Sequence, residues 1–281
     1  MNLIQMVILA LVQGAAELLP ISSSAHVIVA ERWMGLDPSS PEMTFFLVML
    51  HTGTMFAVIL YFWPRWRKLP ISFWKAALLA TGVTGVFGWT LKEFIEKVIL
   101  GHLMGESLPE IEQIFKSLPL IAASLFGVGI LILFAGFNEK KGARRALNLM
   151  TAAKMGAIQG LCLPFRGFSR SGATISVALL SGVKRSLAED FSFACAVLLT
   201  PPVIVREYYR LHHSLSASGT QTMHLAAHFL PGFLGMFFSF LSGLLALQLL
   251  SAGLEHGHWK YFGVYCLAAS VLVLVTHCVL V

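Results

Sequence analysis

Long uninterrupted apolar runs constrain this chain more than any other feature of its sequence. A helix needs about 20 predominantly apolar residues to cross the hydrocarbon core of a bilayer. Six runs meet that requirement, at about 43–63, 72–91, 118–137, 190–206, 228–250 and 259–281. Only 12% of the residues are charged and 57% are hydrophobic, which excludes an ordinary soluble domain. The sequence therefore predicts an all-α integral membrane protein.

Two further apolar stretches, at about 3–35 and 150–184, are each interrupted near the middle by proline, glycine and a cluster of serines. Interrupted helices occur at membrane depth where the backbone is buried in protein or lines a polar cavity. We therefore expect each stretch to form a re-entrant broken helix hairpin and not a span.

The two interrupted stretches share a sparse internal repeat. Gln13-Gly14 recurs as Gln159-Gly160, and Ser23 recurs as Ser169, both with an offset of 146 residues. Each half of the chain then has one hairpin and three spans. Because three crossings are odd, the halves are expected to form an inverted-topology repeat. We expect a single membrane domain, 1–281, made of one repeat at about 1–145 and another at about 146–281.

Basic loops predict how the chain lies in the membrane, since cytoplasmic loops carry an excess of lysine and arginine. The loops after the first and third spans are basic, with Arg65, Arg67, Lys68, Lys140, Lys141, Arg144 and Arg145. The intervening segment 92–117 has five glutamates against three lysines, as expected of an external loop. Both termini are then external. The net charge of +6 mostly reflects the basic loops, so we expect no nucleic-acid partner.

The first interruption places an acid beside a helix break. Gln13 and Glu17 are four residues apart and share one helix face, and Pro20 ends that helix. A carboxylate at membrane depth is costly, so Glu17 is a functional candidate. Three hydroxyls and an imidazole follow on irregular backbone, from Ser22, Ser23, Ser24 and His26. Such groups can act as nucleophile, general acid or general base.

The second interruption, at 164–174, has the composition of a phosphate site. It combines two arginines, two serines, a threonine and two glycines at the start of a new helix. Bare backbone N–H groups, a helix N-terminus, hydroxyl donors and a guanidinium all favour a bound phosphate. The candidates for this role are Gly167, Ser169, Arg170, Ser171 and Thr174.

Together these residues resemble the signatures of the undecaprenyl-pyrophosphate phosphatases of the bacterial cell-envelope lipid carrier cycle, also called bacitracin-resistance proteins. The first signature, a Glu or Gln and a Glu four apart followed by a Pro, a Ser-rich turn and a His, matches Gln13, Glu17, Pro20, Ser22, Ser23 and His26. The second, Pro-Gly-x-Ser-Arg-Ser-Gly-x-Thr, matches Gly167, Ser169, Arg170, Ser171, Gly172 and Thr174. The stretches 50–54 and 191–193 also look like the family, so the resemblance covers most of the chain.

The chain departs from the family pattern at three places. Gln13 stands where the family usually has Glu, which removes a second carboxylate for a metal. Arg166 replaces the Pro of the second signature and adds a positive charge near the expected phosphate. The family's Pro after Phe-Ser-Phe is displaced to Pro201-Pro202.

The resemblance implies a membrane phosphatase that hydrolyses undecaprenyl or another polyprenyl diphosphate to the monophosphate. The site would be open to the external leaflet of the bacterial inner membrane. It also implies Mg²⁺ or Ca²⁺, with Glu17 as the clearest protein ligand or as a base. Ser23 and His26 compete as nucleophile, and a water held by Glu17 and a cation is a third candidate.

In this interpretation Arg170 holds the diphosphate, and the lipid substrate and the bilayer are the partners. A homodimer is left open. The residues that would surround the substrate are Gln13, Ser22, Ser24, Gly167, Ser169, Ser171 and Thr174.

A transporter is the alternative function. Inverted repeats with broken helices at the midplane also hold anionic substrates in secondary transporters. Such a protein would flip polyprenyl monophosphate, with or without hydrolysis.

Overall fold

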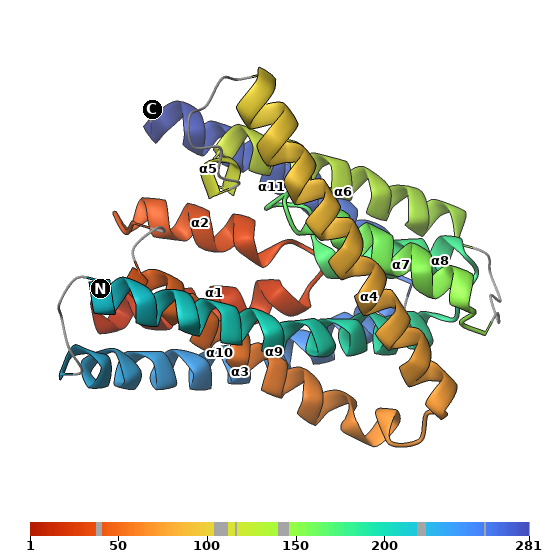
Figure 1. Cartoon of the computed structure of the whole chain (residues 1–281). Coiled ribbons are helices and arrows are strands. Elements are labelled where there is room, and N and C mark those ends of the chain that lie inside the picture. Colours follow the sequence, from red (N-terminus) through yellow and green to blue (C-terminus); the bar gives the residue numbers. More distant parts are fainter. Residues whose placement is uncertain are drawn as a thin grey trace.

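The structure is a computed structural model of the chain (Figure 1). It describes residues 1–37, 41–103, 112–115, 117–139, 146–217, 223–255 and 257–280. Within these ranges all the secondary-structure elements are helices, as predicted for an all-α protein.

A pair of short helices followed by long helices occurs twice along the chain. The first half contains α1 (Leu3–Leu18), α2 (Ser23–Trp33), α3 (Pro41–Trp66), α4 (Ile71–Phe94), the π-helical η1 (Ile95–Leu103), α5 (Glu112–Phe115) and α6 (Leu118–Asn138). The second half contains α7 (Leu149–Cys162), α8 (Arg170–Leu180), α9 (Arg185–Ala217), α10 (Met223–Glu255) and α11 (Trp259–Leu280).

Among the described residues, six helical segments are long and apolar enough to cross a membrane, which confirms the predicted number of spans. They are Met43–Trp66, Ile71–His102, Leu118–Asn138, Arg185–Arg206, Leu230–Leu254 and Trp259–Val279. The second is longer than the apolar run predicted for it. At its charged end Lys92 pairs with Glu96 at 3.2 Å and Lys97 pairs with Glu93 at 2.6 Å. Both pairs are one turn apart, a spacing that favours helix.

Local signals set the ends of the short helices and confirm that both interrupted stretches are broken. Asn2 caps α1 by accepting a hydrogen bond from the Gln5 backbone N–H at 2.9 Å. Pro20 lies in the turn between α1 and α2. Ser169 caps α8 by accepting from the Gly172 N–H at 3.2 Å.

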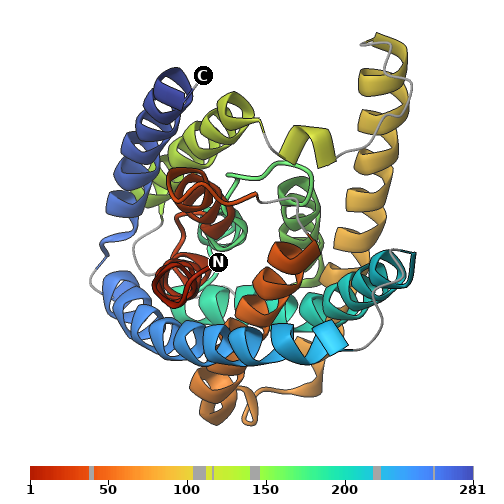
Figure 2. The same cartoon turned by 90° about the vertical axis from the view of Figure 1, so that its left-hand side faces the viewer.

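The two pairs of short helices lie towards the middle of the bundle, and the long helices surround them (Figure 2). α8 is the most enclosed of the four, with eight of its eleven residues buried. α1 packs mainly on α10 and α7 mainly on α4, so each half encloses the first short helix of the other. This arrangement buries the interrupted segments in protein.

The structure describes only part of the charged loops that predict the orientation of the chain in the membrane. Residues 104–111 and 140–145 lie outside the described residues, so the contrast between these two loops stays a prediction. Of the basic residues after the first span, Arg65 is paired with α9. Its Nη2 lies 3.1 Å from Glu189 Oε2, and its Nε lies 2.9 Å from Asp190 Oδ1.

Candidate active site

The two interruptions meet in the interior of the molecule. The Gly167 N–H donates to Ser24 Oγ at 3.4 Å, and Ser171 Oγ donates to the Leu19 carbonyl at 3.2 Å. Gly167 has a φ of +104°, and a Cβ there would lie 2.4 Å from the Ile121 carbonyl oxygen, so this turn requires glycine. Segments from opposite halves of the sequence therefore form one site.

Glu17 is at the centre of this site. Its Oε1 accepts a hydrogen bond from Arg170 Nη2 at 2.5 Å, and its Oε2 accepts from Ser23 Oγ at 2.5 Å. Gln13 Nε2 also donates to Oε2, at 3.3 Å. Arg170 Nη1 is buried and has no hydrogen-bond partner among the described residues. An unsatisfied guanidinium N–H is the kind of donor that pairs with an anion.

His51, from α3, is a site residue that the sequence analysis did not propose. Its Nδ1 lies 2.9 Å from Gln13 Nε2 and 3.7 Å from Glu17 Oε2. Because the amide nitrogen of Gln13 can only donate, His51 Nδ1 is the acceptor. An ionisable residue within an apolar span is a functional candidate by default, and this signal could have identified His51.

His26 and Ser23 have different partners. His26 Nδ1 lies 2.7 Å from the Ser22 carbonyl oxygen, and Nε2 lies 2.8 Å from the Tyr265 hydroxyl. The two rings are stacked, with centroids 5.7 Å apart. Ser23 Oγ donates to Glu17. The hydroxyl of Ser23 is therefore joined to a carboxylate, whereas the imidazole lies against α11.

The residues of the second signature lie at the start of α8, where hydrogen bonds hold their hydroxyl groups in place. Ser169 Oγ lies 3.5 Å from Ser171 Oγ. Thr174 is buried and donates to the Arg170 carbonyl at 2.8 Å, and its Oγ1 lies 2.6 Å from Ser192 Oγ of α9. Thr174 thus fixes the turn that carries Arg170, a supporting contact that differs from the direct substrate contact expected of it.

A cavity of about 310 Å³ opens between the two hairpins, α3 and α9. Polar lining comes from Glu17, Ser22, Ser23, Ser24, His51, Arg166, Ser169, Arg170 and Ser171, among others. Apolar lining comes from Val48, Leu163, Phe165, Phe168, Leu199, Val203 and Ile204, among others. Leu163 and Val203 are 43% and 48% exposed, so the apolar side reaches the surface of the molecule. Four predicted site residues stand outside this lining, namely Gln13, His26, Gly167 and Thr174.

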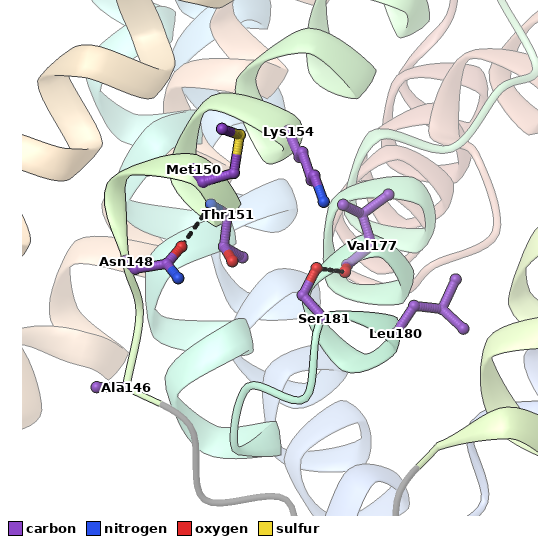
Figure 3. A pocket seen from close by; sticks show the side chains of 8 residues that line it. All are labelled: Ala146, Asn148, Met150, Thr151, Lys154, Val177, Leu180 and Ser181. Atoms are coloured by element: carbon purple, nitrogen blue, oxygen red, sulfur yellow. Dashed lines mark hydrogen bonds between the residues drawn. The ribbon is translucent and has the colours of Figure 1, made fainter.

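A second cavity, of about 460 Å³, lies at the other end of the α7–α8 pair (Figure 3). Asn148, Thr151 and Lys154 from the first turns of α7 line it together with Val177 and Ser181 from the end of α8. None of the predicted site residues lines it. We therefore assign the chemistry to the cavity around Glu17.

The residues around Glu17 fit a divalent cation only if the substrate supplies most of its ligands. Within the described part of the chain, no group of three or more His, Cys, Asp and Glu side chains could hold a metal ion. Both Glu17 oxygens already accept hydrogen bonds, and the neighbouring Gln13 presents its amide nitrogen. Mg²⁺ is commonly held by one or two carboxylates together with substrate phosphates and water, and this site can offer one carboxylate.

Comparison with known proteins finds similarity along almost the whole chain. The family model described as "Bacitracin resistance protein BacA" matches residues 6–272. A protein of Acinetobacter baylyi named "Undecaprenyl-diphosphatase 2" is 54% identical over 98% of both chains. Proteins of Polaromonas sp. and Korarchaeum cryptofilum, each named "Undecaprenyl-diphosphatase", are 32% and 31% identical over 98% of this chain and 95% and 99% of their own.

Proposed function

The chain belongs to the bacitracin resistance protein BacA family, and we propose that it hydrolyses undecaprenyl diphosphate to the monophosphate in the cavity around Glu17. It is an undecaprenyl-diphosphatase of the membrane. The relatives are named as hydrolases, which favours hydrolysis over the transporter alternative. One observation carries the assignment to this cavity, namely that a single carboxylate, Glu17, binds both a hydroxyl, from Ser23, and a guanidinium, from Arg170.

The substrate fits the two sides of the cavity. The diphosphate would bind Arg170 through Nη1, with Ser169 and Ser171 as neutral donors and the start of α8 adding its partial positive charge. The prenyl chain would follow the apolar lining, which is supported by the exposure of Leu163 and Val203 at the surface. A lipid could then reach the site from the bilayer.

In the first step, Ser23 is the nucleophile and Glu17 is its base. Ser23 Oγ already donates to Glu17, so the carboxylate can accept the proton as Oγ attacks the terminal phosphorus. The new Oγ–P bond forms as the bond between that phosphorus and the bridging oxygen breaks. The bridging oxygen leaves with the electron pair on the lipid monophosphate and takes the proton from Glu17. Arg170 stabilises the charge on the transferred group.

In the second step, water releases the phosphate. Glu17, again ionised, accepts a proton from a water molecule that attacks the phosphoserine. The Oγ–P bond breaks, Ser23 regains a proton and inorganic phosphate leaves. The same carboxylate thus serves both half-reactions, which suits a site with one acid.

Mg²⁺ or Ca²⁺ is part of this proposal. Glu17 and the diphosphate oxygens would hold the ion, and it would supply charge neutralisation for the diphosphate. This is supported by the position of the Glu17 carboxylate in the cavity lining, with the Ser23 hydroxyl beside it.

We further propose that the two halves, 1–145 and 146–281, form an inverted repeat with the hairpin tips at its centre. Reciprocal packing supports this. α1 packs on α10 while α7 packs on α4, and the first spans of the two halves, α3 and α9, pack on each other, as do the third spans, α6 and α11.

We also propose that the termini and the cavity face outward at a bacterial inner membrane. Both termini lie at the same end of the bundle in Figure 1, and α3 ends at the other. Arg65 is in the last turn of α3. We place the basic end of the bundle in the cytoplasm. The outer half of the membrane then contains the cavity-lining residues from the first half of α3, Val48 and His51, and those from 196–204 of α9.

A phosphate-release assay on the purified protein tests the function. Wild-type protein in detergent should release inorganic phosphate from undecaprenyl diphosphate, and Glu17→Gln should release almost none. A folded wild-type protein that releases no phosphate, yet moves labelled monophosphate lipid across vesicles, would support the transporter instead.

A further inference from the structure

The His26 ring uses both of its nitrogens within the protein. Nδ1 lies 2.7 Å from the Ser22 carbonyl oxygen and Nε2 lies 2.8 Å from the Tyr265 hydroxyl. A carbonyl oxygen only accepts hydrogen bonds, so Nδ1 carries the proton. In the neutral ring, Nε2 is then the acceptor of the Tyr265 hydroxyl proton. This leaves His26 without a free lone pair for phosphorus or for the Ser23 proton.

The carbonyl group that accepts a hydrogen bond from His26 belongs to Ser22, whose backbone conformation is rare for a residue other than glycine. Ser22 has a φ of 67°, and it is the one non-glycine residue in the described ranges with a positive φ. Residues with a Cβ adopt this conformation rarely, and it persists where surrounding contacts impose it. The peptide that follows leads directly to Ser23, whose Oγ is 2.5 Å from Glu17 Oε2. The contact with His26 therefore holds the backbone immediately before the hydroxyl.

α11 contacts this turn through two adjacent residues. Tyr265 is hydrogen-bonded to His26 and stacked on it at an interplanar angle of 13°. Cys266 Sγ lies 3.4 Å from the Pro20 carbonyl oxygen. Neither residue lines the cavity. α11 thus supports the serine turn from behind the site.

We propose that Tyr265 is a positioning residue for hydrolysis. It holds the His26 ring, the ring holds the Ser22 carbonyl, and this keeps the Ser23 hydroxyl on Glu17. The inference rests on the proposed roles of Ser23 and Glu17, and it makes His26 a positioning residue as well. Binding of the diphosphate depends on Arg170, which this chain of contacts does not include.

The test compares conservative variants of the full-length protein. Tyr265→Phe removes the hydroxyl and keeps the ring, and Tyr261→Phe, one turn earlier on α11 and 59% exposed, is the matched control. Loss of one hydrogen bond should lower kcat about tenfold and leave KM within about twofold, whereas the control should match wild type.

A second substitution separates positioning from chemistry at His26. His26→Asn places an amide N–H near the position of Nδ1 but cannot take a proton or attack phosphorus. It should keep roughly a tenth of the activity, whereas His26→Ala should fall below about a hundredth. In the His26→Asn background, Tyr265→Phe should have no further effect, because the contact it removes is already absent.

The outcomes distinguish this inference from the function on which it rests. An active wild type with a Tyr265→Phe variant that equals the Tyr261→Phe control would overturn the inference alone. So would a folded His26→Asn variant as inactive as His26→Ala, since it would show that the imidazole itself reacts. A wild type that releases no phosphate would overturn the proposed function and the inference with it.

Discussion

Arg170 Nη2 of the second half lies 2.5 Å from Glu17 Oε1 of the first half. Both side chains are mostly buried, so each charge is compensated by the other in a region with little water. Removing one partner of a buried ion pair leaves an uncompensated charge and is strongly destabilising. The pair therefore joins the two hairpins. It also fixes the position of the Arg170 guanidinium, the positive charge that the phosphate would contact.

Arg170→Ala should abolish activity, because the diphosphate loses its positive counter-charge. The loss corresponds to roughly 2–4 kcal/mol by comparison with removal of a donor that stabilises an oxyanion. Arg170→Lys should also be impaired, since a point charge does not reproduce the planar fork. Phosphate release by each folded variant is the measurement, with Ser181→Ala in the second cavity as the control. Near-normal turnover by Arg170→Ala would exclude the phosphate-binding role.

Gln13→Glu should strengthen binding of a divalent cation to the protein without substrate. In the wild type, Glu17 lines the cavity, and Gln13 behind it directs its amide nitrogen at the Glu17 carboxylate. A second carboxylate should raise the affinity for Mn²⁺, used as a spectroscopic substitute for Mg²⁺, by about tenfold or more.

Electron paramagnetic resonance of Mn²⁺ checks this without reference to activity. The control is Gln13→Glu combined with Glu17→Gln, which should return affinity to the weak wild-type value. Tight Mn²⁺ binding by the wild type, unaffected by Glu17→Gln, would place the cation elsewhere.

Much of the fold follows from the sequence, because apolar runs and helix breaks are local features. The six spans and the two broken stretches needed only hydropathy, proline and serine to be predicted. The second span is longer than its apolar run predicts, since the helix continues through charged residues such as Lys92 and Glu96, which pair one turn apart.

The site could be predicted as a set of residues but not as a set of contacts. Glu17, Ser23 and Arg170 do come together, as the paired interruptions suggested. The partner of Ser23 could not be predicted, because the turn before it includes a positive φ at Ser22, a conformation that residues with a Cβ adopt rarely. The presence of an ionisable residue in an apolar span marks His51 as a candidate, but its contact with Gln13 and Glu17 depends on how α3 packs against the first hairpin.

The orientation of the chain predicts the labelling of two loops. A cysteine introduced at position 106 should react with an impermeant thiol reagent applied from outside the cell, and one at position 142 should not. The reason is the acid-rich segment around the first position and the basic residues around the second. The protein should first be made free of its own four cysteines, of which Cys278 is exposed. The reversed pattern would place the cavity on the cytoplasmic side.

The identity of the attacking atom is the central claim, and it can be read from the bond to the phosphoryl group. If Ser23 attacks, the trapped adduct is a phosphoserine, which is stable to acid and labile to base. If His26 attacks, the phosphohistidine shows the opposite stability. If water attacks directly, no adduct forms and the Ser23→Ala variant keeps partial activity.

The most direct measurement is a rapid quench of the purified protein during turnover of undecaprenyl diphosphate labelled at its terminal phosphate, in acid and in base. Peptide mapping then locates the label. We predict an acid-stable label on Ser23, absent from Ser23→Ala, and activity of that variant below about a hundredth of wild type. An acid-labile, base-stable label on His26, or a Ser23→Ala variant with more than that activity, would contradict the serine mechanism.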